Sequence, residues 1–172
     1  MYTLLSKKFK INFYKNKIFT KIFIIFFYIF YLYLGLNIYR DYGIAYDEDI
    51  QRSIGLSNFD YIANKLVNVS SEIIFPYYGV GYELPLILFE KLFKFNNIED
   101  IFLFRHKIIF LTTIIGNIFY FFLLKKIFKS SYYALLGSLL LIISPRLFAE
   151  SFYNSKDIIF MHSFIISVFF GF

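Results

Sequence analysis

Four long stretches of the sequence contain no charged residue, and their lengths constrain the fold more than any other feature. Residues 22–39 and 108–124 have 18 and 17 residues, while 132–145 and 158–172 have 14 and 15. A helix needs roughly 20 mostly apolar residues, within a range of about 17–25, to cross the hydrocarbon core of a bilayer. The first two stretches meet this requirement, and the third meets it when its flanking residues are included. The sequence therefore predicts an all-α membrane protein with about four transmembrane helices.

The composition agrees with a membrane protein. Hydrophobic residues make up 59% of the chain and aromatic residues 24%, while only 17% are charged. A soluble domain has roughly 45–50% apolar and about 25% charged residues. A water-soluble globule of this size could not bury so much apolar surface, and disorder requires the opposite composition. The chain has no Cys, which excludes a disulfide framework and a cysteine metal site. Residues 22–39 exceed the roughly 7–15-residue core of a signal peptide, so we interpret them as a retained anchor.

The charged residues divide between the two ends of these stretches. Residues 1–21 carry six Lys and 125–131 carry three, and neither segment has an acidic residue. All twelve acidic residues fall in 40–107 or 146–157. Short segments rich in Lys and Arg stay cytoplasmic, so we predict that the first pair of segments is inside and the second pair forms outer loops. Nucleic acid is disfavoured as a partner, because the Lys residues flank helices rather than line a continuous groove.

The outer loop of residues 40–107 is long for a connection between two spans, which indicates functional content. Two parts of it repeat apolar residues at helical spacing. The first stripe consists of Phe59, Ile62, Leu66 and Val69. The second stripe consists of Leu84, Leu88, Leu92 and Phe95, opposite Glu83, Glu90, Lys91 and Lys94. The apolar core of the second part, Leu84 to Phe89, is too short to span, and we expect both parts to form amphipathic helices at the outer interface.

Acidic residues follow both the first and the third apolar stretch. Asp47 and Glu48 come shortly after the first stretch, and Glu150 and Asp157 come after the third. Both segments are predicted on the outer side, which allows them to form a single site. The alternative is a solvated acidic loop with a Glu48–Arg52 ion pair, since these two residues are four apart.

Cations accompany the second acidic segment. Arg146 and Lys156 carry groups that bind phosphate, although both also stand where a cation anchors the end of a helix. Transfer of a sugar from a lipid phosphate requires a carboxylate that deprotonates the acceptor hydroxyl and a cation beside the leaving phosphate. It also requires an apolar surface for the lipid. The sequence contains all of these groups.

The order of the motifs along the chain resembles that of the GT-C glycosyltransferases. The closer resemblance is to the dolichyl-phosphate-mannose-protein mannosyltransferase group and its bacterial relatives, the aminoarabinose and Rgt-like transferases. It covers most of residues 35–165. The motifs that carry it are Tyr46-Asp47-Glu48, Tyr82-Glu83-Leu84-Pro85-Leu86, Phe104-Arg105-His106, Leu123-Leu124-Lys125-Lys126-Ile127-Phe128 and Leu139-Leu140-Leu141-Ile142-Ile143-Ser144-Pro145-Arg146.

The resemblance implies a polyprenyl-phosphate sugar donor and an inverting transfer on the outer face of the membrane. By the family's acidic motif in the first loop, Asp47 is the expected catalytic base and Glu48 its neighbour. Glu150 or Asp157 is the expected acid after the third span. The residues expected to bind the donor phosphate are Arg105, Arg146 and Lys156, and the alternative for Arg105 is an interface anchor. The acceptor is not specified by these residues.

No metal site is predicted, because His106 and His162 are too few and too far apart in the chain. A divalent cation, Mg²⁺ or Mn²⁺, is an open alternative, held by Asp47 or Asp49 together with Asp157. Carboxylate oxygens are the ligands that suit these ions.

The last apolar stretch runs to Phe172 without a closing charge. We therefore expect residues 1–172 to be a single N-terminal transmembrane module of a longer protein, and the alternative is a short fourth helix ending near the cytoplasmic interface. Usage rich in Ile, Phe, Lys and Asn favours a bacterial inner membrane over the endoplasmic reticulum. There are two alternatives to an enzyme: a non-enzymatic membrane protein, such as a transporter or scaffold subunit, and an inactive truncated fragment. The four stretches lack the mid-span charges with which a transporter lines a path.

Overall fold

The protein is entirely helical over the residues that the structure describes. The computed structural model describes the backbone of residues 2–66 and 81–172, and the side chains of 18–63 and 81–172. The helices are α1 (Tyr2–Ile38), α2 (Tyr46–Leu66), α3 (Glu83–Phe93), α4 (Ile98–Phe128), α5 (Ser131–Ile143), α6 (Pro145–Tyr153) and α7 (Asp157–Gly171). The expected all-α class is confirmed.

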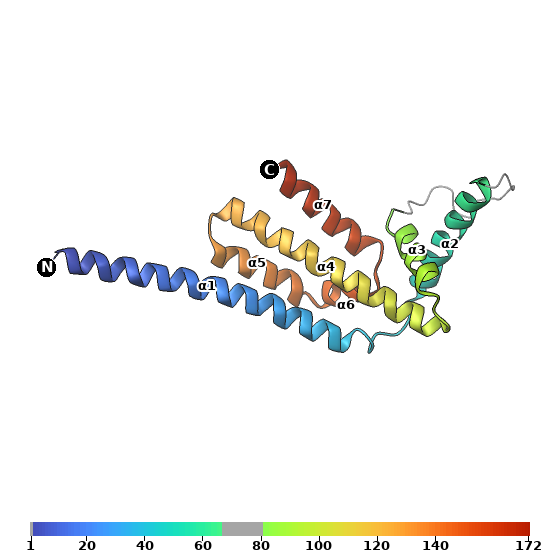
Figure 1. Ribbon diagram of the computed structural model, residues 1–172, viewed down its shortest axis with the longest axis horizontal. Coiled ribbons are helices and arrows are strands. Elements are labelled where there is room, and N and C mark those ends of the chain that lie inside the picture. The colour runs from blue at the N-terminus through green and yellow to red at the C-terminus, as the bar shows by residue number, and fades with distance from the viewer. Residues whose placement is uncertain (1, 67–80) are drawn as a thin grey trace.

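Helix α4 is the centre of a bundle. Helices α5, α6 and α7 pack against it, and α1 runs alongside α4 and α5 (Figure 1). Helices α2 and α3 pack on each other beyond one end of this bundle (Figure 1). The chain thus forms a layer of long apolar helices with a smaller helical pair at one end.

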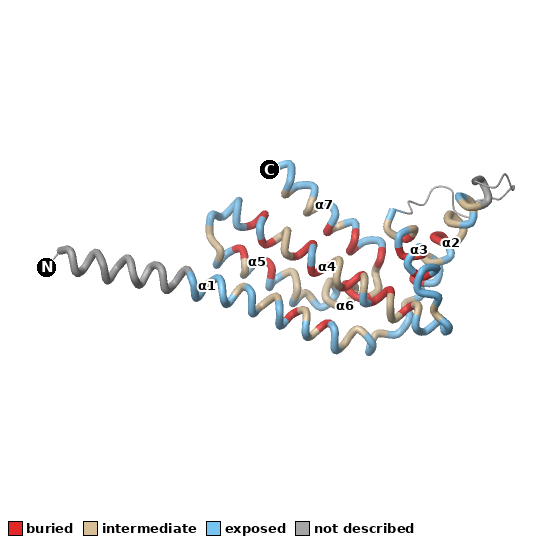
Figure 2. Tube along the Cα trace, in the orientation of Figure 1, coloured by how far each residue is buried: buried red, intermediate tan, exposed pale blue. Residues whose placement is uncertain are grey.

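Aromatic side chains fill the core between α1, α4 and α6. The rings of Phe110 and Phe152 stack with centroids 4.8 Å apart, and Tyr31 meets Phe110 edge to face at 5.3 Å. Gly35 of α1 has no Cβ, and the ring of Phe110 occupies the space that a Cβ would need. Small residues permit such close helix contact in apolar bundles. Figure 2 shows buried positions along α4 and on the helices that pack against it.

Two described helices are long and apolar enough to cross a membrane. They cover Ile18–Ile38 and Ile98–Phe128. Ser131–Ile143 and Pro145–Tyr153 together pass the same test but meet at an angle of 72°, as in a broken span or a re-entrant loop. Pro145 explains the bend, because the residue before a proline is driven out of the helical conformation, and Ser144 has ψ 114°. The chain is a helical membrane protein with two such spans, or three if the bent pair counts as one.

Several helices extend beyond the apolar stretches and stripes that predict them. The expected span 108–124 is the middle of α4, which begins at Ile98, well inside the expected outer loop 40–107. Glu99 and Asp100 in its first turn and Lys125 and Lys126 in its last turn suit the helix dipole, which favours the longer helix.

The first amphipathic helix also begins earlier than its apolar stripe indicates. Helix α2 begins at Tyr46, so the acidic residues that follow the first span lie in its first turn and not in a loop. Its backbone is described to Leu66, so Val69 lies outside the described residues. The second amphipathic stretch corresponds to α3, which ends at Phe93 and is followed by the C-cap residue Lys94 in the left-handed conformation.

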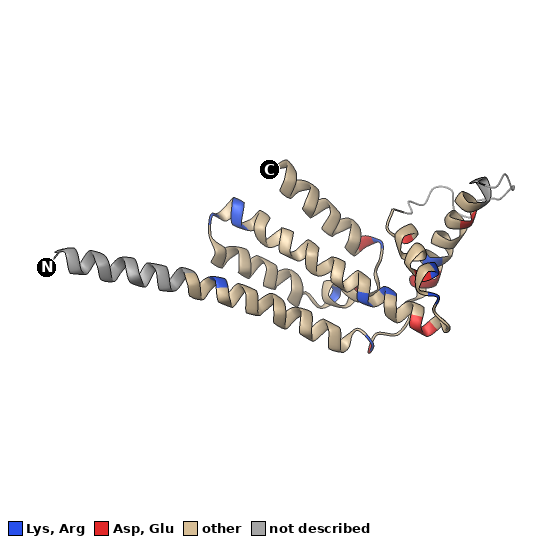
Figure 3. Ribbon diagram, viewed as in Figure 1, with Lys and Arg blue, Asp and Glu red and all other residues tan. Residues whose placement is uncertain are grey.

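Acidic residues gather at one end of the molecule, where some Lys and Arg residues also lie. Figure 3 shows acidic residues at the end that carries α2, α3 and the beginnings of α4 and α7. Lysines lie at the opposite end, where α4 meets α5. The two segments predicted to form outer loops therefore lie at the same end of the bundle.

Candidate functional site

A cavity of about 480 Å³ lies between the beginning of α2 and the loop that joins α6 to α7. Asp47 and Glu48 line it from α2, and Asn154, Lys156 and Asp157 line it from the loop. These two segments are about 100 residues apart in the chain, and helix packing brings them to opposite walls of one cavity. Its volume falls within the range of about 300–1,000 Å³ that is usual for small-molecule sites.

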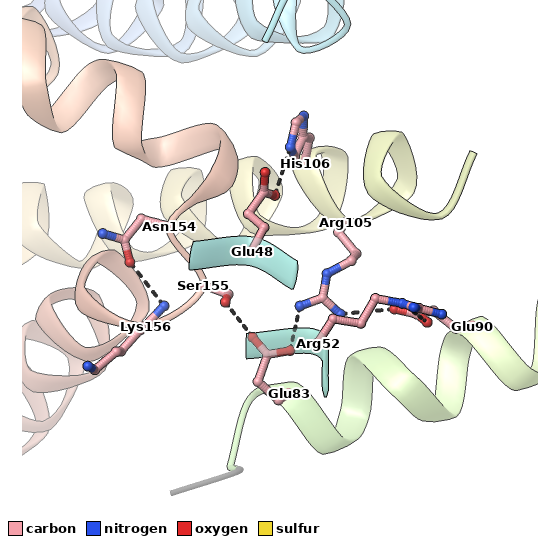
Figure 4. Close-up of polar contacts among 9 residues, drawn as sticks. All are labelled: Glu48, Arg52, Glu83, Glu90, Arg105, His106, Asn154, Ser155 and Lys156. Atoms are coloured by element: carbon pink, nitrogen blue, oxygen red, sulfur yellow. Dashed lines mark hydrogen bonds and ion pairs between the residues drawn. The ribbon is translucent and has the colours of Figure 1, made fainter. Parts of the chain in front are cut away.

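Glu48 anchors the first wall. It is 3% exposed, and its Oε2 accepts a hydrogen bond of 2.7 Å from the backbone N–H of Ala45. This is half of a capping box, in which the third helical residue reaches back to the residue before the helix. Its Oε1 is 2.8 Å from Nε2 of His106 on α4 (Figure 4). Both carboxylate oxygens of Glu48 are therefore engaged, whereas Asp47 is exposed.

Asn154 organises the second wall. Its side-chain oxygen accepts hydrogen bonds from the backbone N–H groups of Lys156 at 3.1 Å and Asp157 at 2.8 Å. Figure 4 shows this turn beside Ser155. A side-chain oxygen of Asn satisfies N–H groups that have no partner within a helix, so this turn is well suited to the start of α7. The side chains of Lys156 and Asp157 are exposed in the cavity.

A buried ion cluster lies behind the cavity. Arg105 of α4 is 1% exposed, and its two terminal nitrogens bind Glu83 and Glu90 of α3. Arg52 of α2 pairs with the second oxygen of Glu90 at 2.9 Å. Glu83 also accepts a hydrogen bond from Ser155 Oγ (Figure 4). The cluster therefore joins α2, α3, α4 and the cavity loop.

Tyr82 fastens the beginning of α3 to α4. Its hydroxyl is 3.0 Å from Thr112 Oγ1. Burial raises the pKa of Tyr82 to about 12, although the hydrogen bond with Thr112 opposes part of this rise. Burial also raises the pKa of Tyr42, which precedes the cavity and stacks on Phe152 with centroids 4.6 Å apart. Both phenols are therefore neutral at physiological pH.

The structure brings together some of the predicted site residues and not others. Asp47, Glu48, Lys156 and Asp157 line the cavity. Arg146 and Glu150 do not; they pair with each other at 2.7 Å along α6.

Two residues have other partners than the sequence suggests. Arg105 contacts carboxylates inside the protein and does not line the cavity, and its role in binding the donor phosphate stays a prediction. The expected Glu48–Arg52 pair does not form, because Arg52 pairs with Glu90 and Glu48 with His106.

Metal-binding groups do not gather in the described part of the chain. Within residues 18–63 and 81–172, no group of three or more His, Asp and Glu side chains could hold a metal ion. Asp47 and Asp157 do line one cavity, and Asp49 is not among its lining residues.

Sequence reasoning missed the buried carboxylates. Glu83 and Glu90 are seven residues apart, which places them on one helical face two turns apart, with Leu86 and Ile87 buried between them. The sequence interpretation placed this face opposite the apolar stripe. The available signal was the spacing of the two acids together with an Arg-His pair in the same predicted outer segment.

Comparison with known proteins finds no matching family model, no matching curated protein and no matching solved structure.

Proposed function

We propose that the chain forms the donor-binding and catalytic module of a membrane glycosyltransferase of the GT-C type, which transfers a sugar from a polyprenyl phosphate. The observation that carries the proposal is the cavity, whose walls present Asp47 on one side and Lys156 and Asp157 on the other. A carboxylate opposite a cation is the arrangement that base-assisted displacement of a phosphate requires.

The proposed step forms one bond and breaks another. Asp47 takes the proton from the acceptor hydroxyl as its oxygen attacks the anomeric carbon of the sugar. The bond between that carbon and the phosphate oxygen breaks, and its electron pair leaves with the phosphate. Lys156 stabilises the charge of the leaving phosphate. Attack on the face opposite the phosphate inverts the anomeric centre through an oxocarbenium-like transition state.

Asp47 is a better base than Glu48 because it is exposed where it lines the cavity, whereas Glu48 is buried. Glu48 is held by Ala45 and His106, so it fixes the first turn of α2 and thereby the position of Asp47. Asp157 is placed to bind sugar hydroxyls, since it lines the opposite wall.

The proposed topology has four crossings, formed by α1, α4, the bent pair α5–α6, and α7. Lysines lie in the first part of α1 and in the last turn of α4, which supports a cytoplasmic location for those ends and an outer location for the cavity. Helices α2 and α3 then lie at the outer interface, and the polyprenyl chain of the donor lies against the apolar helices. A bacterial inner membrane is the proposed location.

The test uses the chain in lipid nanodiscs with radiolabelled undecaprenyl-phosphate monosaccharides of several sugars and solubilised bacterial membranes as acceptors. Donor binding and loss of label from the lipid are both measured. We expect Asp47→Asn to bind the donor and to transfer about 10²–10⁴-fold more slowly, because a general base contributes about this factor. The matched control is Asp49→Asn, since Asp49 is exposed in the same turn and does not line the cavity.

A second pair of variants tests the cation. Lys156→Gln is expected to weaken donor binding, whereas Arg146→Gln removes an exposed cation outside the cavity and leaves binding unchanged. Wild-type protein that binds no donor of the series would overturn the proposal and favour a non-enzymatic membrane protein. Equal transfer by the Asp47 and Asp49 variants would remove Asp47 from its role.

A further inference from the structure

Ser155 and Glu83 connect the cavity loop to the interfacial helix α3. We infer that Glu83 is a positioning residue for the donor phosphate, which acts through Ser155 to hold the loop that carries Lys156. This inference rests on the proposed function of the cavity. It assigns a role to a carboxylate that does not line the cavity itself.

The contact is buried and involves both carboxylate oxygens. Ser155 is 5% exposed, and its Oγ donates to Oε1 of Glu83, which is 4% exposed. The other oxygen of Glu83 accepts from Arg105 Nη2. A hydrogen bond to a carboxylate in a dry environment is stronger than one between neutral groups, so this connection is stiff.

Ser155 and its two neighbours in the chain all line the cavity. Asn154 and Lys156 both line the cavity and are linked by the hydrogen bond between the Asn154 side chain and the Lys156 backbone. Displacement of Ser155 therefore displaces the Lys156 backbone, and with it the ammonium group at the end of that side chain. Figure 4 shows Ser155 between this turn and Glu83.

Arg105 of α4 binds Glu83, and Glu83 in turn binds Ser155, so Arg105 connects the cavity loop to the central helix of the bundle. Its Nη1 binds Glu90 at 2.9 Å, and Glu90 binds Arg52 at 2.9 Å. The positive charges of Arg52 and Arg105 neutralise the negative charges of Glu83 and Glu90. Glu83 is therefore held against α4, and the cluster adds no net charge near the cavity. Its role follows from geometry, since an error of about 1 Å in the placement of a reacting group can cost about 10²-fold in rate.

The test removes one hydroxyl. Ser155→Ala is compared with Ser151→Ala in the nanodisc-embedded chain, by affinity for undecaprenyl phosphate, by KM and kcat for the donor, and by thermal unfolding. Ser151 is a suitable control because it is also buried, donates to the Phe148 carbonyl within α6, and does not line the cavity. We expect Ser155→Ala to weaken undecaprenyl phosphate binding and raise KM by about 10–100-fold, with a change in unfolding temperature similar to that of the control.

Two further variants separate positioning from folding. Ser155→Thr keeps the hydroxyl and is expected to restore KM to within about threefold of the wild type. Glu83→Gln keeps an oxygen that accepts from Ser155 but loses the ion pair with Arg105, so it is expected to raise KM and also to lower the unfolding temperature. Equal affinity and KM for Ser155→Ala and Ser151→Ala, in a chain whose wild type binds the donor, would overturn the inference alone. Absence of donor binding by the wild type would overturn the proposed function.

Discussion

Asp47 and Glu48 are neighbours in the chain, and their carboxylates have opposite surroundings. Glu48 turns inward to the Ala45 backbone and His106, while Asp47 is exposed at the cavity. Successive residues of a helix point about 100° apart, so one of two adjacent acids can face the protein and the other the solvent. The acidic motif in the sequence indicates the segment that contributes to the site. The position of α4 decides which of the two acids, Asp47 or Glu48, is buried and which is exposed.

Arg105 is the residue whose removal should destabilise the chain most clearly. In Arg105→Met, the carboxylate of Glu83 is left buried without its cation, while Glu90 keeps Arg52. Breaking a buried ion pair by removing one partner costs about 3–5 kcal/mol, so we expect the free energy of unfolding to fall by this amount. Chemical denaturation of the purified chain in detergent measures it.

The matched control for this prediction is Arg146→Met. Arg146 forms its pair with Glu150 on the exposed side of α6, where water screens the charges. We expect little change in stability from this substitution. If the two variants lost the same free energy of unfolding, the buried position of the Arg105 cluster would make it no more stabilising than an exposed ion pair.

At the scale of the elements, α3 differs from an ordinary amphipathic helix of a soluble protein. Its acidic residues Glu83 and Glu90 are buried against α4, while Leu92 is 71% exposed. In water this arrangement would be unfavourable, because the leucine face of the helix would be exposed to solvent while its acidic face is buried. At a membrane interface it is favourable, since lipid covers the leucines and the acids find cations within the protein. The apolar stripe alone indicates a helix but not which face meets the bundle.

The contact between α4 and α7 depends on a glycine. A Cβ at Gly116 would overlap the side chain of His162, which is 2% exposed. We expect Gly116→Ala to lower the free energy of unfolding by about 1–3 kcal/mol, the usual cost of overpacking. Chemical denaturation in detergent measures this change too. Gly171→Ala is the control, because a Cβ there meets no atom within 4 Å.

A smaller effect at Gly116 than at Gly171 would contradict this close packing. It would also imply that α7 is free to move away from α4. The position of Asp157, the first residue of α7, would then depend on the cavity loop alone.

At the scale of the whole molecule, charge predicts the orientation in the membrane, and helix packing brings the two walls of the cavity together. Lysines lie at the turn between α4 and α5 (Figure 3), whereas the cavity is lined by the beginning of α2 and the segment that joins α6 to α7. Positively charged segments resist translocation, so one charge pattern is sufficient to orient the entire bundle. Every acidic segment that lines the cavity then faces the same compartment.

Single cysteines test this orientation without background, because the chain has none. Ser53→Cys lies at an exposed position of α2, and Ser130→Cys lies between α4 and α5. In intact bacterial spheroplasts, we expect a membrane-impermeant maleimide to label Ser53→Cys, and to label Ser130→Cys only after the membrane is opened. Labelling of Ser130→Cys in intact spheroplasts would reverse the topology and place the cavity in the cytoplasm.

The amino-acid sequence by itself determines that this chain is helical and belongs in a membrane. Both properties follow from local quantities, namely the lengths of the apolar stretches and the placement of lysines at their ends. The sequence also indicates the two acidic segments of the candidate site. Which of their residues meet depends on contacts across long separations, such as Ser155 with Glu83 and Glu48 with His106. Those contacts arise only when the helices pack, because packing decides which face of each helix is buried.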